Sequence, residues 1–187
     1  MRGERNDAPD RRSRILEGAR MAFLRFGFER SSMADIAKGA GVSRTALYHY
    51  FPGKDDVLQA LIEALHTRTH EIASEALEHS PDLATALRGL LEAKFGRALA
   101  LMSESPNGVE LVDATHRLTG PATRAADQAF QDLVVKALVR HGRPRDAEAV
   151  ADTLVAAAKG LMRAGDLHAT KARFAERIAR LVAWATK

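Results

Sequence analysis

The sequence predicts an all-α protein of nine helices, with a small three-helix unit at the N-terminus followed by a larger helical bundle. Apolar residues recur at steps of three and four along nearly the whole chain, which is the period of an amphipathic helix. No segment shows sustained alternation of apolar and polar residues with β-branched side chains, as a strand would. Gly and Pro fall between the periodic segments, where helices end.

The N-terminal unit is expected to contain three helices. The first spans 10–26 and ends at Gly27, after which Phe28 folds back onto the last turn. A capping box opens the second helix, at 32–39, and Ser43 caps the third, at 44–50. A long helix at 54–79 follows, and the remaining helices are expected at 82–103, 108–118, 121–141, 145–164 and 169–186.

Composition narrows the possible functions. The chain has 187 residues and a net charge of +4. Residues 1–54 hold eleven Lys and Arg against six Asp and Glu, so the excess positive charge is N-terminal, which indicates a polyanionic partner there. There is no Cys, which excludes disulfides, thiolate metal sites and Cys nucleophiles. We find neither a signal peptide nor an apolar run of the roughly 18 residues that span a bilayer, and expect a cytoplasmic protein without membrane contact.

Residues 33–50 have the pattern of a helix-turn-helix. Ala37 is small enough for two helices to cross closely, and Gly41 tolerates the positive φ of the turn four residues later. Several apolar residues fall at the positions that face a shared core, although the helical period leaves Tyr50 undecided between packing and a phosphate contact. A plain αα-corner without a DNA partner is the alternative interpretation. The residues expected in the core are Ile36, Ala40, Val42, Leu47 and Phe51, with Tyr50 undecided.

The segment ILEGARMAFLRFGFERSSMADIAKGAGVSRTALYHYFPGKDDVL resembles the DNA-binding domain of the TetR (tetracycline repressor) family of transcriptional regulators. This resemblance covers residues 14–58. It implies three parts: a flexible basic tail at 1–9, a DNA-binding domain at 10–55, and a C-terminal effector-binding and dimerisation domain at 56–187. It also implies a homodimer that binds a palindromic operator, usually as a repressor, and is released by a small-molecule effector. No enzymatic activity and no cofactor are implied.

The resemblance also assigns roles around the recognition helix. Arg44 and Thr45 lie in its first turn, where side chains reach base edges. An Arg there suits guanine O6 and N7, and a Thr methyl suits the methyl group of thymine. The other candidates are expected mainly at phosphates, and the tail arginines either reach a minor groove or stay solvated. The predicted DNA-binding residues are Ser31, Ser32, Ser43, Arg44, Thr45, Tyr48, His49, Tyr50 and Lys54.

In the C-terminal part, polar residues on otherwise apolar stripes and adaptable apolar residues are candidates for an effector pocket. The alternative for each, which is the commoner case, is a boundary residue with a routine hydrogen bond. The ligand candidates are Thr69, Lys94, Phe95, Met102, Asp113, His116, Asp127 and Met162.

The last two helices are expected to form the dimer interface, as in nine-helix members of the family; an intramolecular cap is the alternative. The interface candidates are Leu154, Ala157, Ala158, Leu161, Phe174, Ile178, Leu181 and Trp184.

Two competing classes remain. Glu63, His66 and His70 have the spacing of metal ligands on one helical face, but such residues on a charged helix are usually solvated, and we expect no metal site. One alternative function is that of an α-helical enzyme or metal-binding protein in which the helix-turn-helix is incidental. A DNA-binding family member without an effector is the other.

Overall fold

The computed structural model describes residues 10–103, 105–111, 114, 120–163 and 171–187. The chain forms two compact units. The first contains Met1–Glu63 together with Ser105–Thr119, and the second contains Ala64–Glu104 and Gly120–Lys187. The first unit therefore includes a short segment from the second half of the sequence.

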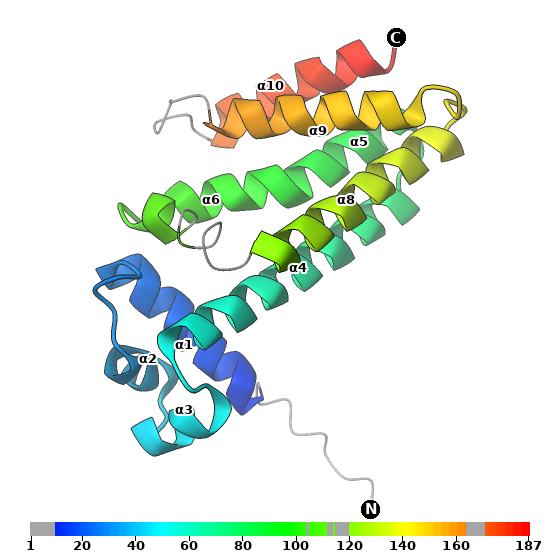
Figure 1. Ribbon diagram of the computed structural model, residues 1–187. Helices are drawn as coiled ribbons and strands as arrows, with labels where there is room; N and C mark the ends of the chain where they lie inside the picture. The colour runs from blue at the N-terminus through cyan, green and yellow to red at the C-terminus, as the bar shows by residue number, and fades with distance from the viewer. Residues whose placement is uncertain (1–9, 104, 112–113, 115–119, 164–170) are drawn as a thin grey trace, which may run out of the picture. The chain divides into compact units, whose positions relative to one another are not determined.

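The first unit is built from α1 (Arg11–Phe26), α2 (Met33–Ala40), α3 (Arg44–Tyr50) and the first turns of α4 (Lys54–Glu78), which Figure 1 shows in blue to cyan. Helix ends lie within one or two residues of the predicted positions. Phe28 does fold back onto α1, where its ring meets that of Phe23 edge-to-face at 5.2 Å between centroids. The core of this unit consists of Ile15, Ala19, Phe23, Phe28, Ile36, Leu47, Val57 and Leu58.

Helices α1 and α2 cross at very short range because two glycines face each other there. A Cβ atom at Gly18 would lie only 2.4 Å from the backbone nitrogen of Ala40, and a Cβ at Gly39 would lie 3.0 Å from the carbonyl oxygen of Gly18. Ala37, predicted at the crossing of the two helices of the helix-turn-helix, is buried, whereas the glycine pair between α1 and α2 was not predicted. The absence of side chains at both positions fixes how tightly α2 packs on α1.

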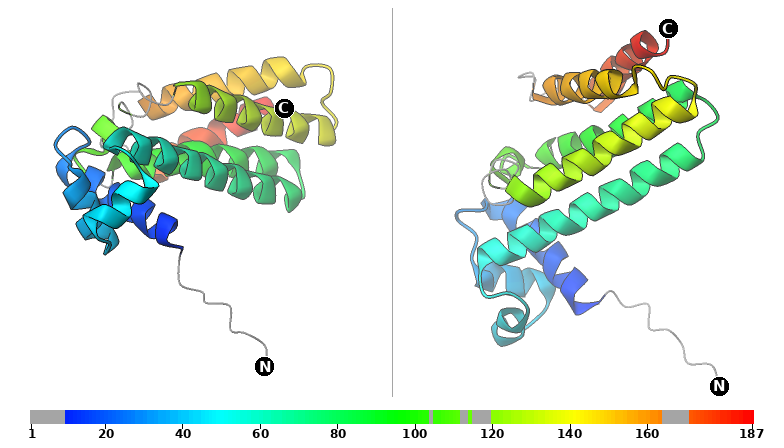
Figure 2. Two further views of the ribbon diagram at one scale, coloured as in Figure 1. Left: turned by 60° about the horizontal axis from the view of Figure 1, so that its bottom comes forward. Right: turned by 45° about the vertical axis from the view of Figure 1, so that its right-hand side comes forward.

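The second unit begins within α4 and continues through one unbroken helical run, α5 (Leu83–Leu91), η1 (Glu92–Gly96) and α6 (Arg97–Ser103). The middle section is a single π-helical turn, where the sequence predicted a regular helix. The unit is completed by α8 (Gly120–Arg140), α9 (Ala147–Arg163) and α10 (Lys171–Ala185). Figure 2 shows α9 and α10 side by side, and α9 also packs on α8.

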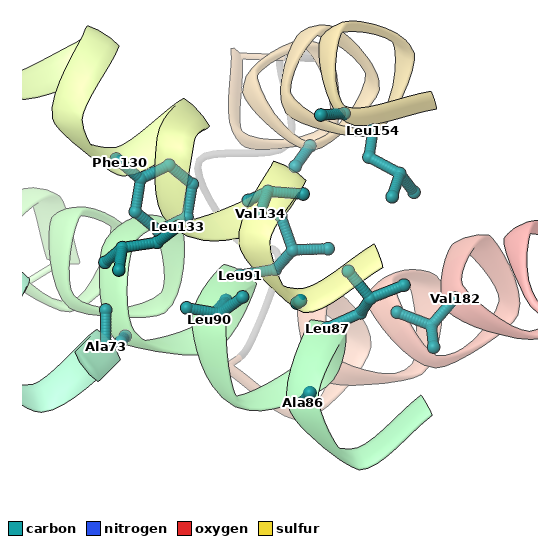
Figure 3. Packing of buried hydrophobic residues seen from close by; sticks show 14 of the residues in the cluster. Ala73, Ala86, Leu87, Leu90, Leu91, Phe130, Leu133, Val134, Leu154 and Val182 are labelled. Atoms are coloured by element: carbon teal, nitrogen blue, oxygen red, sulfur yellow. The ribbon is translucent and has the colours of Figure 1, made fainter. Parts of the chain in front are cut away.

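Figure 3 shows the core of the second unit, to which α5 contributes Ala86, Leu87, Leu90 and Leu91. Leu87, Leu90 and Leu91 are fully buried in one cluster with Val134 of α8 and Leu154 of α9. Val182 of α10 closes the cluster.

The predicted all-α class is confirmed, since the residues listed above contain helices and turns but no strand. The predicted helix at 108–118 is described only in part, with residues 108–111 helical. Within the same ranges, no helix combines the length and the apolarity that a membrane crossing requires.

Candidate nucleic-acid interface

Most side chains of α3 are exposed to solvent, and Leu47 is its buried residue. Ser43 caps its N-terminus, where the hydroxyl oxygen accepts a hydrogen bond from the Ala46 amide at 3.1 Å. Leu47 is completely buried and fixes the helix to the rest of the unit. The polar residues of this helix are exposed as a consequence, and they are Arg44, Thr45, Tyr48, His49 and Tyr50.

The turn before α3 has the geometry that the helix-turn-helix pattern predicted. Gly41 adopts a left-handed conformation with φ of 63°, which a side chain would disfavour. The amide of Val42 then donates to the carbonyl oxygen of Ala37 at 3.0 Å, which closes the end of α2. These bonds set the direction in which α3 leaves α2.

Tyr50 is the aromatic residue that the sequence left undecided, and its ring is exposed. It keeps 42% of its accessible surface, and Tyr48 keeps 48%, whereas the neighbouring Phe51 keeps 6%. Of the two interpretations of Tyr50, its exposure favours a contact outside the core, because Leu47 and Phe51 already fill the contact with the core. The exposed phenol groups lie on α3 and at its C-terminal end.

Ser31 and Ser32 hold the start of α2 in different ways. Ser31 is buried, and its hydroxyl donates to the carbonyl oxygens of Gly27 at 2.6 Å and Ala22 at 3.2 Å. Its side chain therefore builds the fold, in place of the phosphate contact that we predicted. Ser32 is exposed and forms the predicted capping box with Asp35. The hydroxyl and the amide of Ser32 both donate to Asp35 Oδ2, which lowers the pKa of that carboxyl group.

Lys54 opens α4, and its ammonium group points back into the unit. Nζ donates to the carbonyl oxygen of Phe28 at 2.7 Å and to that of Glu29 at 3.1 Å. The same nitrogen lies 4.6 Å from the centroid of the Phe28 ring. Two of its three N–H groups therefore stabilise the turn between α1 and α2. These bonds give Lys54 a structural role that the sequence did not predict, and its phosphate contact stays a prediction.

The second unit has a cavity of about 410 Å³ on residues that the sequence partly identified. Three of the ligand candidates meet there, since Thr69 and Lys94 line the cavity and Lys94 Nζ lies 2.7 Å from Asp127 Oδ1. Lys94 Nζ also lies 4.8 Å from the ring centroid of Phe130, another lining residue. The other lining residues include His66, His70, Ala125 and Ala129. The pocket is partly open to solvent, and its volume falls in the range of small-molecule sites.

The other ligand candidates lie elsewhere. Phe95 is buried in the core, edge-to-face with Phe130 at 6.0 Å between centroids. Met162 packs against the same core, and Met102 is half-buried on α6. Asp113 and His116 lie outside the described residues. Glu63, His66 and His70 do not form a metal-binding group, and no set of three His, Asp or Glu side chains does so in the part of the chain that the structure describes.

The predicted dimer residues divide into two groups. Leu154, Ala158, Phe174 and Ile178 are buried within the unit itself, where they complete its core. The apolar faces of α9 and α10 thus cover α5 and α8 and are not available to a second subunit. The assignment of these four residues to the dimer interface was wrong, because they are core residues of the unit. Ala157, Leu161 and Leu181 are half-buried, and Trp184 keeps 64% of its accessible surface.

One group of residues was missed in the sequence. Ser105, Asn107 and Glu110 form hydrogen bonds with the end of α1 and the turn after it. The sequence around them, Ser-Pro-Asn-Gly, indicated only the end of a helix. No local pattern shows that such a turn contacts residues about 80 positions earlier.

Comparisons with known proteins agree with this geometry. Residues 15–61 match the family profile described as "Bacterial regulatory proteins, tetR family". The transcriptional regulator TtgR of Pseudomonas putida is 37% identical over 83 residues, which are 44% of this chain and 39% of that protein. Alignments to the first curated relatives span about two fifths of their length.

Solved structures resemble the whole fold. The fatty acid degradation regulator FadR of Bacillus halodurans superposes with a TM-score of 0.73 and 16% identity, over 96% of each chain. A FadR structure from Bacillus subtilis, in complex with stearoyl-CoA, gives a TM-score of 0.67 with 15% identity, over 92% of this chain and 96% of that one. At such low identity the likeness establishes the fold alone.

Proposed function

We infer that this chain, a TetR-family protein by its N-terminal domain and its fold, acts as a DNA-binding transcriptional regulator. One observation carries the proposal. A short helix is held by a buried leucine, and five polar or aromatic side chains on it are left exposed behind a capped N-terminus. Such a helix, preceded by a left-handed glycine turn, has the form of a major-groove recognition helix.

Arg44 and Thr45 are the proposed base-reading residues. Both lie in the first turn of α3 and are exposed. The N-terminal turn of such a helix is the part that contacts base edges in the major groove of DNA. A guanidinium group can donate two hydrogen bonds to guanine, whereas a threonine methyl packs on thymine. Ser43, Tyr48, His49 and Tyr50 are proposed to contact phosphates and sugars around them, with Ser32 at the start of α2.

We propose that two copies bind a palindromic operator. A recognition helix of seven residues contacts few base pairs, so a second copy is needed for a site of useful length. The half-sites would be separated by about one turn of DNA, roughly 34–36 Å, or somewhat more. The outer faces of α9 and α10 are the proposed contact between the copies, with the exposed Trp184 as its main apolar residue.

The cavity of the second unit is the proposed effector site. It combines an apolar wall, including Ala129 and Phe130, with the ammonium group of Lys94, which is paired with Asp127. A ligand that prefers one arrangement of this unit would shift the population of the dimer away from the form that docks on DNA. The stearoyl-CoA complex of a protein with this fold supports a small-molecule effector in general. Repression relieved by the effector is the proposed outcome.

The experiment that tests the proposal is selection of binding sites from a random duplex library by the purified protein. We expect an inverted repeat to emerge and to bind with a strong dependence on salt concentration, as phosphate neutralisation requires. A scrambled duplex of the same composition is the control. Equal binding of the selected and the scrambled duplex would contradict the proposed function.

A further inference from the structure

The end of helix α1 is capped by a segment from the second half of the sequence. Ser105 Oγ donates to the carbonyl oxygen of Leu24 at 2.7 Å. Asn107 Nδ2 donates to the same oxygen at 2.9 Å and to that of Arg25 at 3.2 Å. The last carbonyl groups of a helix have no partner within the helix, and here they receive donors from a segment about 80 residues further along.

The same segment holds the turn that follows α1. Asn107 Oδ1 accepts a hydrogen bond from Arg30 Nη2 at 3.1 Å, while Arg30 Nε donates to the carbonyl oxygen of Phe26 at 2.8 Å. Glu110 Oε1 accepts from the amide of Glu29 at 3.1 Å. The Glu110 carboxylate lies so close to Gly27 that a Cβ atom there would be 2.6 Å from Oε2. The turn is therefore bound along its length.

This turn leads directly into the helix-turn-helix. Ser31, its last residue, is buried and bonded to Gly27, and Ser32 caps α2. Any displacement of the turn would move the start of α2, and α3 would follow because Gly41 and Val42, which link the two helices, are hydrogen-bonded to the end of α2. The orientation of the recognition helix thus depends on the hydrogen bonds made by Asn107 and its neighbours.

We propose that Asn107 is a positioning residue for DNA binding, and that Ser105, Asn107 and Glu110 form an anchor that fixes the helix-turn-helix. This inference rests on the proposed DNA-binding function. Asn107 is central because its amide group donates to the end of α1 while its oxygen accepts from Arg30, so one side chain joins the helix and the turn. None of its bonds requires contact with DNA.

The test uses Asn107→Ala and Asn107→Asp in the full chain. Asp keeps the size of the side chain and an acceptor for Arg30, but it loses the donors to Leu24 and Arg25. Both variants are expected to bind the selected inverted repeat about three- to tenfold more weakly, the range for one or two net hydrogen bonds. The slope of affinity against salt should stay unchanged, because no phosphate contact is removed. Ser103→Ala, which removes a hydroxyl bonded only within its own helix, is the control and should bind as the wild type.

Amide hydrogen exchange provides a measurement that does not need DNA. The amide of Glu29, which Glu110 accepts from, should exchange at least about fivefold faster in both Asn107 variants, while amides in α9 keep their rates. Unchanged exchange at Glu29 would overturn the anchor. Faster exchange together with wild-type affinity for DNA would overturn the positioning role. If the wild type binds no selected duplex, the proposed function fails and the positioning role fails with it, whatever the exchange rates show.

Discussion

Replacing Lys54 by Met distinguishes the role that the structure gives this residue from a contact with DNA. Met keeps much of the length of the side chain but removes the ammonium group and its bonds to Phe28 and Glu29. Hydrogen bonds from a charged donor contribute about 1.5–3 kcal/mol each, and the two share one donor group, so we expect a loss of about 2–3 kcal/mol. For a chain of this size that corresponds to a fall of roughly 4–12 °C in the unfolding midpoint.

Circular dichroism during heating measures the stability, and titrations of the selected duplex at several salt concentrations measure DNA binding. We expect affinity to fall because the turn before α2 loosens, with the salt slope unchanged. Lys38→Met is the matched control, since Lys38 is an exposed lysine of α2 in the same unit, and its stability should change by no more than about 0.5 kcal/mol. A Lys54→Met variant with normal stability and a salt slope lower by about 0.9 would refute this reasoning and restore a phosphate contact.

Three further predictions concern other parts of the chain. Gly18→Ala should lower the free energy of unfolding by about 1–2 kcal/mol in thermal unfolding, because the added Cβ meets the Ala40 backbone. Gly96→Ala is the control and should have no such effect, because a Cβ there meets nothing closer than 3.9 Å. Equal effects of the two substitutions would contradict the close crossing. Hydrogen bonding lowers the pKa of Asp35 below 3.8, so its cap is fully present above that pH and is lost as the pH falls through the lowered pKa. NMR shifts of the α2 amides should follow this titration, and the Asp35→Asn substitution should abolish it. Trp184→Ala should shift sedimentation towards a monomer without unfolding the chain, because the ring is exposed in the single chain; an unaltered dimer would exclude it from the interface.

The helices of the first unit could be predicted well from the sequence, because the residues that begin and end them act within a few positions. Ser32 and Ser43 cap helices with residues three positions away, and Gly41 adopts its positive φ within a single turn. Leu47 could be assigned to the core because the helical period places it opposite the polar residues of α3. These features need no knowledge of what lies elsewhere in the chain.

Residues whose roles depend on distant partners could not be assigned. The helical period shows that Leu154 and Phe174 lie on apolar faces, but not whether α5 or a second subunit covers those faces. Lys54 was assigned by resemblance, yet its ammonium group binds carbonyl oxygens 25 and 26 residues earlier. Asn107 gave no signal at all, because its partners near the end of α1 are about 80 residues away.

The most direct test of the account is the base preference of the wild type and of Arg44→Ala, measured as dissociation constants for the selected duplex and for versions with each G·C pair replaced. One replacement is expected to weaken binding by the wild type about 10- to 100-fold, as a bidentate contact from Arg to guanine requires. Arg44→Ala should no longer distinguish that replacement and should still bind with a salt-dependent affinity. An Arg44→Ala protein with the same base preference as the wild type would contradict the claim that α3 reads DNA through its first turn.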